Sequence, residues 1–304
     1  MTRYARQTCL PEVGEVGQAR LAAGRVLVAG AGGLGASLLP LLAGAGIGLI
    51  RLYDPDRVEE SNLHRQTLFR MDDIGRPKAL VTAETLRGLN PDCHVSTVVS
   101  RLDPLTARSE IPQVDIVIDS ADNFAVSYAL SDLCLATGTP LISASVLARR
   151  GYAGGFCGGA PSLRAVFPDL PGQMQNCATG GVMGPAVATL GALQAQMALS
   201  VLLGHDPSPL GQILNLDLAS WHLSGFRFDG APEPARATPE VISGAELSAA
   251  DLVVDLRSDN GAEVSPDPDQ RVVFVCNTGL RAWRAAKWLS ASGHDRVAIV
   301  GDGR

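Results

Sequence analysis

The sequence predicts an α/β fold in which helices cover both faces of a mostly parallel sheet, followed by a small second α/β unit. Three observations lead to this fold class. Short apolar runs of strand type alternate with longer apolar stretches of helical type. A glycine-rich turn joins the first run to the first helical stretch. After Phe228 the composition changes to that of a linker, and two further apolar runs follow.

The first strand, turn and helix are typical of a phosphate-binding unit. Arg25–Ala29 is a short apolar run and Ser37–Ala45 is rich in Leu and Ala; between them lies the turn Gly30-Ala31-Gly32-Gly33-Leu34-Gly35. This arrangement turns backbone N–H groups and a helix N-terminus toward a phosphate. The next run, Ile47–Tyr53, ends at Asp54, near the spacing at which such folds place a carboxylate on ribose hydroxyls. These features alone describe any dinucleotide-binding fold.

Three polar side chains after the second strand favour ATP over a nicotinamide cofactor. Asn62 and Arg65 belong to the run Ser61-Asn62-Leu63-His64-Arg65-Gln66, and Lys78 begins a helical stretch that ends at Leu89. Hydride transfer needs no cations beside the phosphates. Attack on the α-phosphate of ATP does, because it spreads charge over the phosphoryl oxygens, which Arg, Lys and Mg²⁺ stabilise. The alternative is that Lys78 is an ordinary solvated residue at the start of a helix.

Acidic and amide side chains follow the third predicted strand. Val114–Asp119 is rich in β-branched residues, as in a buried parallel strand, and Asp119, Asp122 and Asn123 lie at its carboxyl end. Open α/β sheets bind their ligands at that edge. A carboxylate there suits a Mg²⁺ that also contacts substrate phosphates. Alternatively, Asp122 and Asn123 only cap the helix that starts near Phe124.

From Arg3-Tyr4-Ala5-Arg6-Gln7 to about Arg227, the chain resembles the MoeB/ThiF/HesA family. These relatives of the ubiquitin-activating enzymes have a Rossmann-like fold and adenylate the C-terminal glycine of a small ubiquitin-fold sulfur carrier protein. The resemblance implies that Asp122 binds Mg²⁺ and that Arg6, Arg65 and Lys78 act on ATP, Arg6 reaching it from the other subunit of a homodimer. It implies an ATP site made of Gly30, Gly32, Gly33, Gly35, Asp54, Ser61, Asn62, Leu63, His64, Arg65, Gln66, Lys78, Asp122 and Asn123.

Two cysteine features of the family have different outcomes in this sequence. The run Asn176-Cys177-Ala178-Thr179-Gly180-Gly181-Val182 resembles the family segment that carries a sulfur-handling cysteine. Family members commonly hold a structural zinc with two Cys-x-x-Cys pairs, but the first pair is replaced here by Ser162 and Ala165. A closed structural zinc site takes four ligands such as thiolates. We predict no zinc, because the six cysteines form no Cys-x-x-Cys pair: Cys9, Cys93, Cys134, Cys157, Cys177 and Cys276.

Composition favours a cytoplasmic enzyme. A chain of 304 residues with 46% hydrophobic and 18% charged residues has room for two domains and a sizeable core. A net charge of −6 argues against a nucleic-acid binder. Scattered cysteines and the absence of a signal peptide indicate the reducing cytoplasm.

Two uncharged stretches are long enough to suggest membrane spans, Val26–Ile50 and Val182–Leu203. The first contains several glycines and fits a strand, turn and helix better. The second contains Pro185, Gln194 and Gln196, which favour a buried or dimer-facing helix. We therefore expect no membrane contact.

The chain after Phe228 predicts a linker and a second unit. Asp229–Pro239 contains three prolines, so we divide the chain into an adenylation domain at 1–228, a linker at 229–239 and a small domain at 240–304. Asp251–Leu256 and Arg271–Val275 are strand-like, and Ala282–Ser290 is helical. Between the second strand and the helix lies Cys276-Asn277-Thr278-Gly279-Leu280-Arg281. A cysteine among the N–H groups of such a loop favours a thiolate or persulfide, to which Arg281 adds positive charge.

This loop, Val254-Asp255-Leu256-Arg257 and the ending Val297-Ala298-Ile299-Val300-Gly301-Asp302-Gly303 together resemble a rhodanese domain. In that family the loop cysteine carries a persulfide. The unit is abbreviated, because only Ser258–Gln270 separate its two strands and the usual Gly-His-Ile-Pro-Gly-Ala stretch is missing. The alternative to sulfur transfer is a degenerate domain kept for binding or packing.

The predicted reaction is adenylation of a sulfur carrier ending in Gly-Gly, followed by sulfur transfer that forms its thiocarboxylate. A persulfide on Cys276, loaded from thiosulfate or a desulfurase, attacks the acyl adenylate directly or after acyl transfer to Cys177; the sequence does not order these two cysteines. Three other functions remain open. A nicotinamide-dependent oxidoreductase leaves Arg65, Lys78 and Asp122 without a role. A tRNA-adenylating enzyme has no use for Cys276, and a non-catalytic module would keep only the carrier-binding surface.

Overall fold

The computed structural model describes residues 3–170, 181–235, 239–257, 265–276 and 279–300. Its main element is an eight-stranded sheet with the strand order β3-β2-β1-β4-β5-β6-β7-β8. The first five strands in that order run parallel, and β6 to β8 continue the sheet antiparallel. The strands are β1 (Arg25–Ala29), β2 (Leu49–Tyr53), β3 (His94–Val98), β4 (Ile116–Asp119), β5 (Pro140–Leu147), β6 (Arg150–Cys157), β7 (Gln212–Asp217) and β8 (His222–Arg227).

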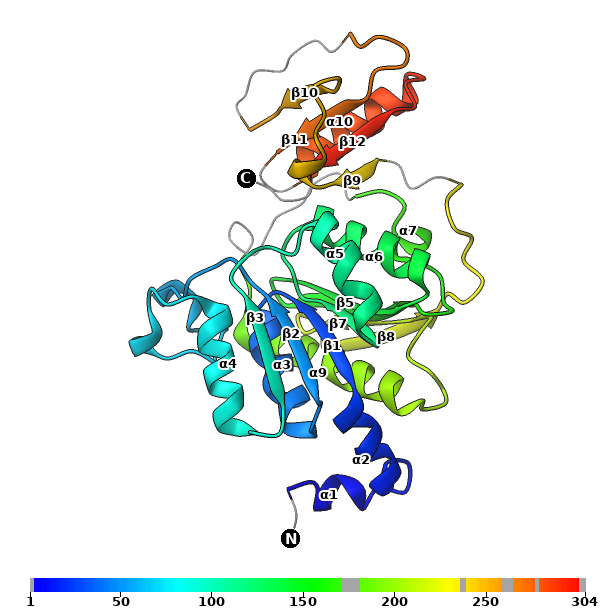
Figure 1. Cartoon of the computed structure of the whole chain (residues 1–304). Coiled ribbons are helices and arrows are strands. Elements are labelled where there is room, and N and C mark those ends of the chain that lie inside the picture. The colour runs from blue at the N-terminus through cyan, green and yellow to red at the C-terminus, as the bar shows by residue number, and fades with distance from the viewer. Residues whose placement is uncertain (1–2, 171–180, 236–238, 258–264, 277–278, 301–304) are drawn as a thin grey trace.

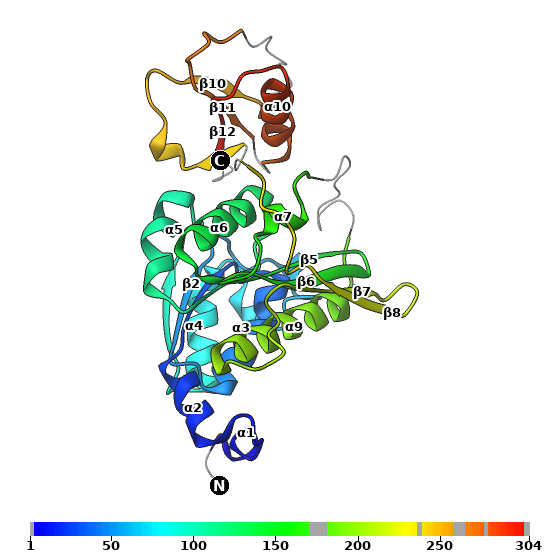
Figure 2. The same cartoon turned by 90° about the vertical axis from the view of Figure 1, so that its right-hand side faces the viewer.

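Helices cover both faces of this sheet, as the sequence predicts (Figure 2). One face carries α3 (Gly33–Ala45), α4 (Lys78–Leu89) and α9 (Gly184–Leu203). The other carries α5 (Pro104–Glu110), α6 (Phe124–Thr137) and α7 (Leu163–Val166). An apolar core fills each of the two layers. Short helices α1 (Ala5–Thr8) and α2 (Gly14–Ala23) precede β1, and the 3₁₀ turns are Glu60–Asn62, Met71–Asp73, Ile111–Gln113 and Gly244–Glu246.

A second, four-stranded parallel sheet lies beyond α5 and α6 (Figures 1 and 2). Its strand order is β10-β11-β12-β9, and α10 (Leu280–Ala291) packs on it. The strands are β9 (Glu240–Ile242), β10 (Leu252–Asp255), β11 (Val272–Val275) and β12 (Val297–Val300). Apolar side chains of α10 and of one face of this sheet join those of α6 in a single core, and those of the other face form a separate cluster. We call residues 240–300 of this sheet and helix the C-terminal unit.

Element boundaries follow local sequence patterns closely. The first strand and the helix from Lys78 to Leu89 occupy the residues that the pattern predicts. The helix after the glycine turn begins at Gly33, four residues before Ser37, because Gly33 and Gly35 already have helical conformation. The long apolar stretch near residue 190 forms α9, the only described helix long and apolar enough to cross a bilayer. Half of its apolar window is buried in the protein, where it packs against α3.

The glycine turn requires a close approach between α3 and the backbone of Gly30, the residue that follows β1. A Cβ atom at Gly35 would lie 2.4 Å from the carbonyl oxygen of Gly30. Gly30 itself has φ of 100°, a conformation that residues with a side chain rarely adopt. The first turn of the helix can therefore touch the turn only if it carries no side chain there.

We expect Gly35→Ala and Gly44→Ala, two changes in the same helix, to have opposite effects on stability. The first forces α3 away from the turn and lowers the free energy of unfolding by about 1–3 kcal/mol. At Gly44 an added Cβ meets nothing within 4 Å, so alanine raises it by about 0.5–1 kcal/mol through helix propensity. Urea denaturation of both variants measures this. Equal destabilisation by both would contradict the close-approach argument.

Candidate nucleotide site

The glycine turn is held against the loop that follows β4. The single hydroxyl hydrogen of Ser120 is shared between the carbonyl oxygens of Ala29, at 2.9 Å, and Gly30, at 2.8 Å. On its other side the turn is open, because an added Cβ at Gly32 would meet no atom within 4 Å. Gly32 is the N-cap of α3, so the free N–H groups of the first helical turn lie beside this open side. The geometry is that of a phosphate cradle.

Asp54 braces the same turn. Its carboxylate is buried at the end of β2, where one oxygen accepts the N–H of Ala31 at 2.6 Å and the other that of Asp56 at 2.8 Å. Burial raises the pKa of Asp54, although these hydrogen bonds and Lys78 act in the opposite direction. Each oxygen keeps a lone pair for a second donor. The ribose contact predicted from the sequence remains a prediction, and the structure adds a second role in shaping the turn.

The two predicted cations approach the turn from different segments. The aliphatic stem of Arg65 lies 3.8 Å from the Cβ position of Gly33, and its guanidinium donates to the carbonyl oxygen of Ser61 at 3.1 Å. Lys78 is the first residue of α4; its buried ammonium group forms an ion pair with Asp56 at 3.0 Å. Lys78 is thus not the solvated helix-start residue of the alternative interpretation. Its buried charge is available beside Asp54.

The run from residue 61 to 66 contributes buried polar atoms as well. Asn62 is buried, and its amide donates to the hydroxyl of Ser61 at 3.1 Å. The Oε1 atom of Gln66 is buried without a hydrogen-bond partner among the described residues. Leu63 packs on the core, and His64 is exposed. A buried acceptor left without a donor costs free energy, so Gln66 is suited to a ligand that brings one.

The loop after β4 separates the roles of its polar residues. Asn123 caps α6, since its side chain accepts the N–H groups of Ala125 and Val126 at 2.9 and 3.4 Å. Asp122 makes no part of this cap and is exposed. The alternative in which both residues are mere caps therefore holds for Asn123 alone. Asp122 is exposed and lies just after the carboxyl end of β4, where open α/β sheets bind ligands, and its metal role remains a prediction.

Asp119 has a role that the sequence pattern did not indicate. It is buried, and its carboxylate accepts the hydroxyl of Ser143 at 2.8 Å and the N–H of Ala121 at 3.2 Å. Burial raises the pKa of Asp119. Its carbonyl oxygen accepts the side-chain amide of Gln194 from α9 at 2.7 Å. Asp119 thus fixes the start of the Asp122 loop to two neighbouring elements, and nothing in local sequence could identify Ser143 or Gln194 as its partners.

These residues fit a nucleotide carrying Mg²⁺. The cradle has an open side at Gly32, Gln66 offers an unsatisfied buried acceptor, and Asp122 is exposed beside the turn. No group of three or more His, Cys, Asp or Glu side chains is placed to hold a metal within the described residues. A Mg²⁺ needs none, because it is usually bound by one or two carboxylates together with substrate phosphates.

The predicted sulfur-handling residues are spread more widely. Cys177 falls outside the described residues. Cys276 follows β11 and is buried, with its sulfur accepting the N–H of Ala282 at 3.3 Å. Arg281 is exposed and donates to the carbonyl oxygen of Arg257 at 3.2 Å. The N–H contact from α10 agrees with the sequence argument.

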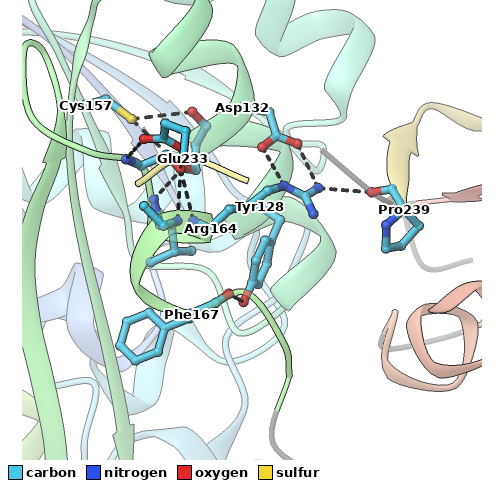
Figure 3. Close-up of polar contacts among 11 residues, drawn as sticks. Tyr128, Asp132, Cys157, Arg164, Phe167, Glu233 and Pro239 are labelled. Atoms are coloured by element: carbon cyan, nitrogen blue, oxygen red, sulfur yellow. Dashed lines mark hydrogen bonds and ion pairs between the residues drawn. The ribbon is translucent and has the colours of Figure 1, made fainter. Parts of the chain in front are cut away.

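The positions that hold zinc ligands in the resembled family are connected differently here. The carboxylate of Glu233 accepts both the N–H and the hydroxyl of Ser162, each at 2.6 Å (Figure 3). Ser162 is also the N-cap of α7, accepting the N–H groups of Arg164 and Ala165. A hydrogen-bonded carboxylate thus ties the predicted linker at 229–239, called the connector below, to α7 at Glu233. The absence of zinc remains a prediction.

The fold and the site define a nucleotide-binding α/β protein. A model of the ThiF family matches residues 4–236, and the chain belongs to that family. It is 40% identical over 219 residues to the SAMP-activating enzyme E1 of Haloferax volcanii, covering 71% of this chain and 81% of the relative. It is 39% identical over 225 residues to the sulfur carrier protein adenylyltransferase of Thermus thermophilus, covering 71% and 83%.

Two further similarities are more restricted. The chain is 42% identical over 218 residues to the adenylyltransferase and sulfurtransferase MOCS3 of Sus scrofa, covering 71% of this chain and 48% of the relative. It therefore spans about half the length of that relative. Among solved structures, MccB of E. coli superposes with a TM-score of 0.68 at 24% identity, covering 77% of this chain and 74% of MccB. At that identity the likeness establishes the fold alone.

Arg6 lies far from the cradle of its own chain. It is exposed on α1, whose neighbour Gln7 donates to the carbonyl oxygen of Ala45 at the last turn of α3. The cradle lies at the first turn of that 13-residue helix, about 18 Å away at 1.5 Å per residue. Figure 1 likewise places α1 at the end of the molecule opposite to the C-terminal unit.

We expect Arg6→Ala to abolish ATP–pyrophosphate exchange, and mixing it with inactive Arg65→Ala to restore part of it. Each mixed dimer would then contain one intact site, since the predicted homodimer brings Arg6 of one chain to the ATP site of the other. Mixed dimers of Arg65→Ala and Lys78→Ala provide the control and should stay inactive. Failure of the first mixture in verified mixed dimers would mean that the site is not shared between chains.

Proposed function

We propose that this protein uses ATP to adenylate the C-terminal glycine of a small ubiquitin-fold sulfur carrier protein and then forms its thiocarboxylate. The observation that supports the proposal is that Asp54, Lys78 and Arg65 gather at the glycine turn. Ser120 also fastens to this turn the loop that contains Asp122. Relatives at 39–40% identity, which cover more than two thirds of this chain, are named for activating SAMP and a sulfur carrier.

The chemistry of adenylation needs electrostatic help more than a base. The terminal carboxylate of the carrier is already ionised at neutral pH, since its ordinary pKa is about 3.5. The N–H groups at Gly32 and Gly33 would hold phosphate oxygens, and Arg65 and Lys78 would stabilise charge on the phosphoryl group and on departing pyrophosphate. Mg²⁺, held by Asp122, would neutralise further phosphate charge.

Sulfur transfer would follow on the acyl adenylate. The terminal sulfur of a persulfide on Cys276 attacks the acyl carbonyl, AMP departs, and an acyl disulfide remains. A thiol then attacks the Cys276 sulfur, releasing the thiocarboxylate and leaving a disulfide that a cellular thiol reductant resets. Cys177 is a candidate for that thiol or for an earlier acyl carrier. The sulfur donor is thiosulfate or a desulfurase persulfide.

A second candidate is adenylation alone, with the C-terminal unit as a degenerate rhodanese-like domain kept for binding or structure. Cys276 is buried, with 1% of its surface exposed, and this burial favours the second candidate. Under either proposal we place the protein in the cytoplasm as a homodimer that contacts neither nucleic acid nor membrane. We retain the division into 1–228, 229–239 and 240–304 as part of the proposal.

The experiment that tests adenylation is ATP–pyrophosphate exchange with and without a small carrier ending in Gly-Gly. We expect exchange that depends on the carrier and that Asp122→Ala abolishes, because this variant loses the proposed Mg²⁺ ligand. The fold should be preserved, since the exposed side chain can be removed without opening a core cavity. The matched control is Asp92→Ala, an exposed acidic residue in the loop before β3. Normal exchange in the Asp122→Ala variant would rule out Asp122 as the Mg²⁺ ligand. Exchange that is equally fast in the absence of a carrier would contradict a carrier protein as the substrate.

The experiment that tests sulfur transfer follows the mass of the carrier. Cys276→Ala should still exchange pyrophosphate but form no thiocarboxylate, because only the persulfide is lost. Cys9→Ala, which removes an exposed free cysteine, is the control and should form it normally. Thiocarboxylate at the normal rate in the Cys276 variant would leave adenylation alone as the function.

A further inference from the structure

The C-terminal unit is packed against the adenylation domain through a buried aromatic contact. The rings of Tyr128 on α6 and Trp283 on α10 lie with centroids 4.6 Å apart. Both side chains are 2% exposed, and they belong to the core that also contains Cys276. Burial of two large aromatic rings between α6 and α10 favours a fixed arrangement over a free tether.

Arg164 of α7 holds this contact from a third side. Its guanidinium carbon lies 5.1 Å from the Tyr128 ring centroid and 5.1 Å from that of Trp283. The two ends of its planar fork donate to the carboxylate of Asp132 at 2.7 and 2.8 Å, and one also donates to the carbonyl oxygen of Pro239 at 3.0 Å. Figure 3 shows this fork between Asp132 and Pro239. We call Tyr128, Arg164 and Trp283 the latch.

The connector to the C-terminal unit is fastened on the same helix. Pro239 immediately precedes β9, so Arg164 binds the backbone where the second sheet begins. Two residues earlier in α7's cap, Ser162 binds Glu233 through two hydrogen bonds. The short helix α7 therefore grips the connector at both ends of residues 233–239.

Docking brings the cysteine loop to the adenylation edge. A Cβ atom at Gly279, the N-cap residue of α10, would lie 2.9 Å from the Cβ of Ala125 in the first turn of α6. Asp122 lies three residues before Ala125, and Cys276 three residues before Gly279. The residues that would carry sulfur and those that would bind metal thus come from loops that meet at the start of α6.

We propose that Arg164 is a positioning residue for sulfur transfer: through the latch it holds the Cys276 loop against the start of α6, beside Asp122. The proposal rests on the proposed function. Arg164 is 3% exposed, and a buried planar fork with a carboxylate and two aromatic rings is geometrically specific in a way that lysine cannot reproduce. The exposed ion pairs Lys287–Asp169 and Arg108–Glu246, at 2.8 and 3.0 Å, lie on the periphery and contribute little to docking.

Two variants break the latch from opposite sides. Arg164→Met combined with Asp132→Asn removes the fork without leaving a buried unpaired carboxylate. Trp283→Ala removes the aromatic partner and keeps the ion pair, while Trp283→Phe restores a ring. If one variant fails to fold, the other still tests the proposal. Lys287→Ala, which breaks a peripheral ion pair, is the matched control.

Tryptophan fluorescence measures the docking of the C-terminal unit on α6 without an activity assay. The chain has three tryptophans, and Trp221 and Trp288 are 81% and 68% exposed. In a Trp221→Phe, Trp288→Phe background Trp283 is the sole reporter. We expect blue-shifted emission poorly quenched by acrylamide, which shifts to the red and becomes several-fold more quenchable in the Arg164/Asp132 variant, but not with Lys287→Ala.

Activity is then compared in two assays. In the Arg164/Asp132 and Trp283→Ala variants we expect normal pyrophosphate exchange and at least tenfold slower thiocarboxylate formation, with Trp283→Phe near the parent rate. Unchanged fluorescence, or undocking with normal thiocarboxylate formation, would overturn the positioning role. Absence of exchange in the unmodified protein with every Gly-Gly carrier would instead contradict the proposed function, while the fluorescence still decides whether the latch exists.

Discussion

The site depends on the contact between the turn after β1 and the loop after β4. β1 and β4 are neighbours in the sheet. The chain continues from β1 to β2 on one side and from β4 to β5 on the other, so the loops after the two strands lead away in opposite directions. Ser120 joins them through hydrogen bonds to two carbonyl oxygens of the turn. Because Gly30 and Gly35 carry no side chains, the backbone segments approach closely enough for that bond. The phosphate cradle and the Asp122 loop are thereby built as one rigid piece.

Buried carboxylates stabilise this piece at an electrostatic cost. Asp54 and Asp119 are both buried, and burial raises the pKa of each. Their oxygens accept backbone N–H groups within the same loops whose shape the site requires. A carboxylate that is already desolvated and hydrogen-bonded needs little reorganisation when a ligand arrives, which is the condition for strong electrostatic catalysis. Burial of the two carboxylates lowers the free energy of unfolding, and their preorganised hydrogen bonds favour ligand binding at the site.

A hydrogen-bonded carboxylate and a buried guanidinium join the two units of the protein beside α6. Glu233 accepts two hydrogen bonds from Ser162, the N-cap residue of α7. The additional grip of Arg164 on Pro239 and on the aromatic pair supplies restraint from elsewhere. The four-residue helix α7 thereby binds the segment that joins the first sheet to the C-terminal unit.

Local sequence patterns predicted the α/β fold class, the family and several elements of the first sheet. Apolar runs gave β1 and the helix Lys78–Leu89 to the residue, because strands and amphipathic helices have local periods. The order of the nucleotide motifs was readable because each is a short, contiguous run. Only the tertiary structure decided which polar partners meet: Asp54 with Ala31, Asp119 with Ser143 and Gln194, and Arg164 with Trp283. Such partners are separated by 23 to 119 residues in the sequence, where no local pattern links them, and their pairing follows from how the layers pack.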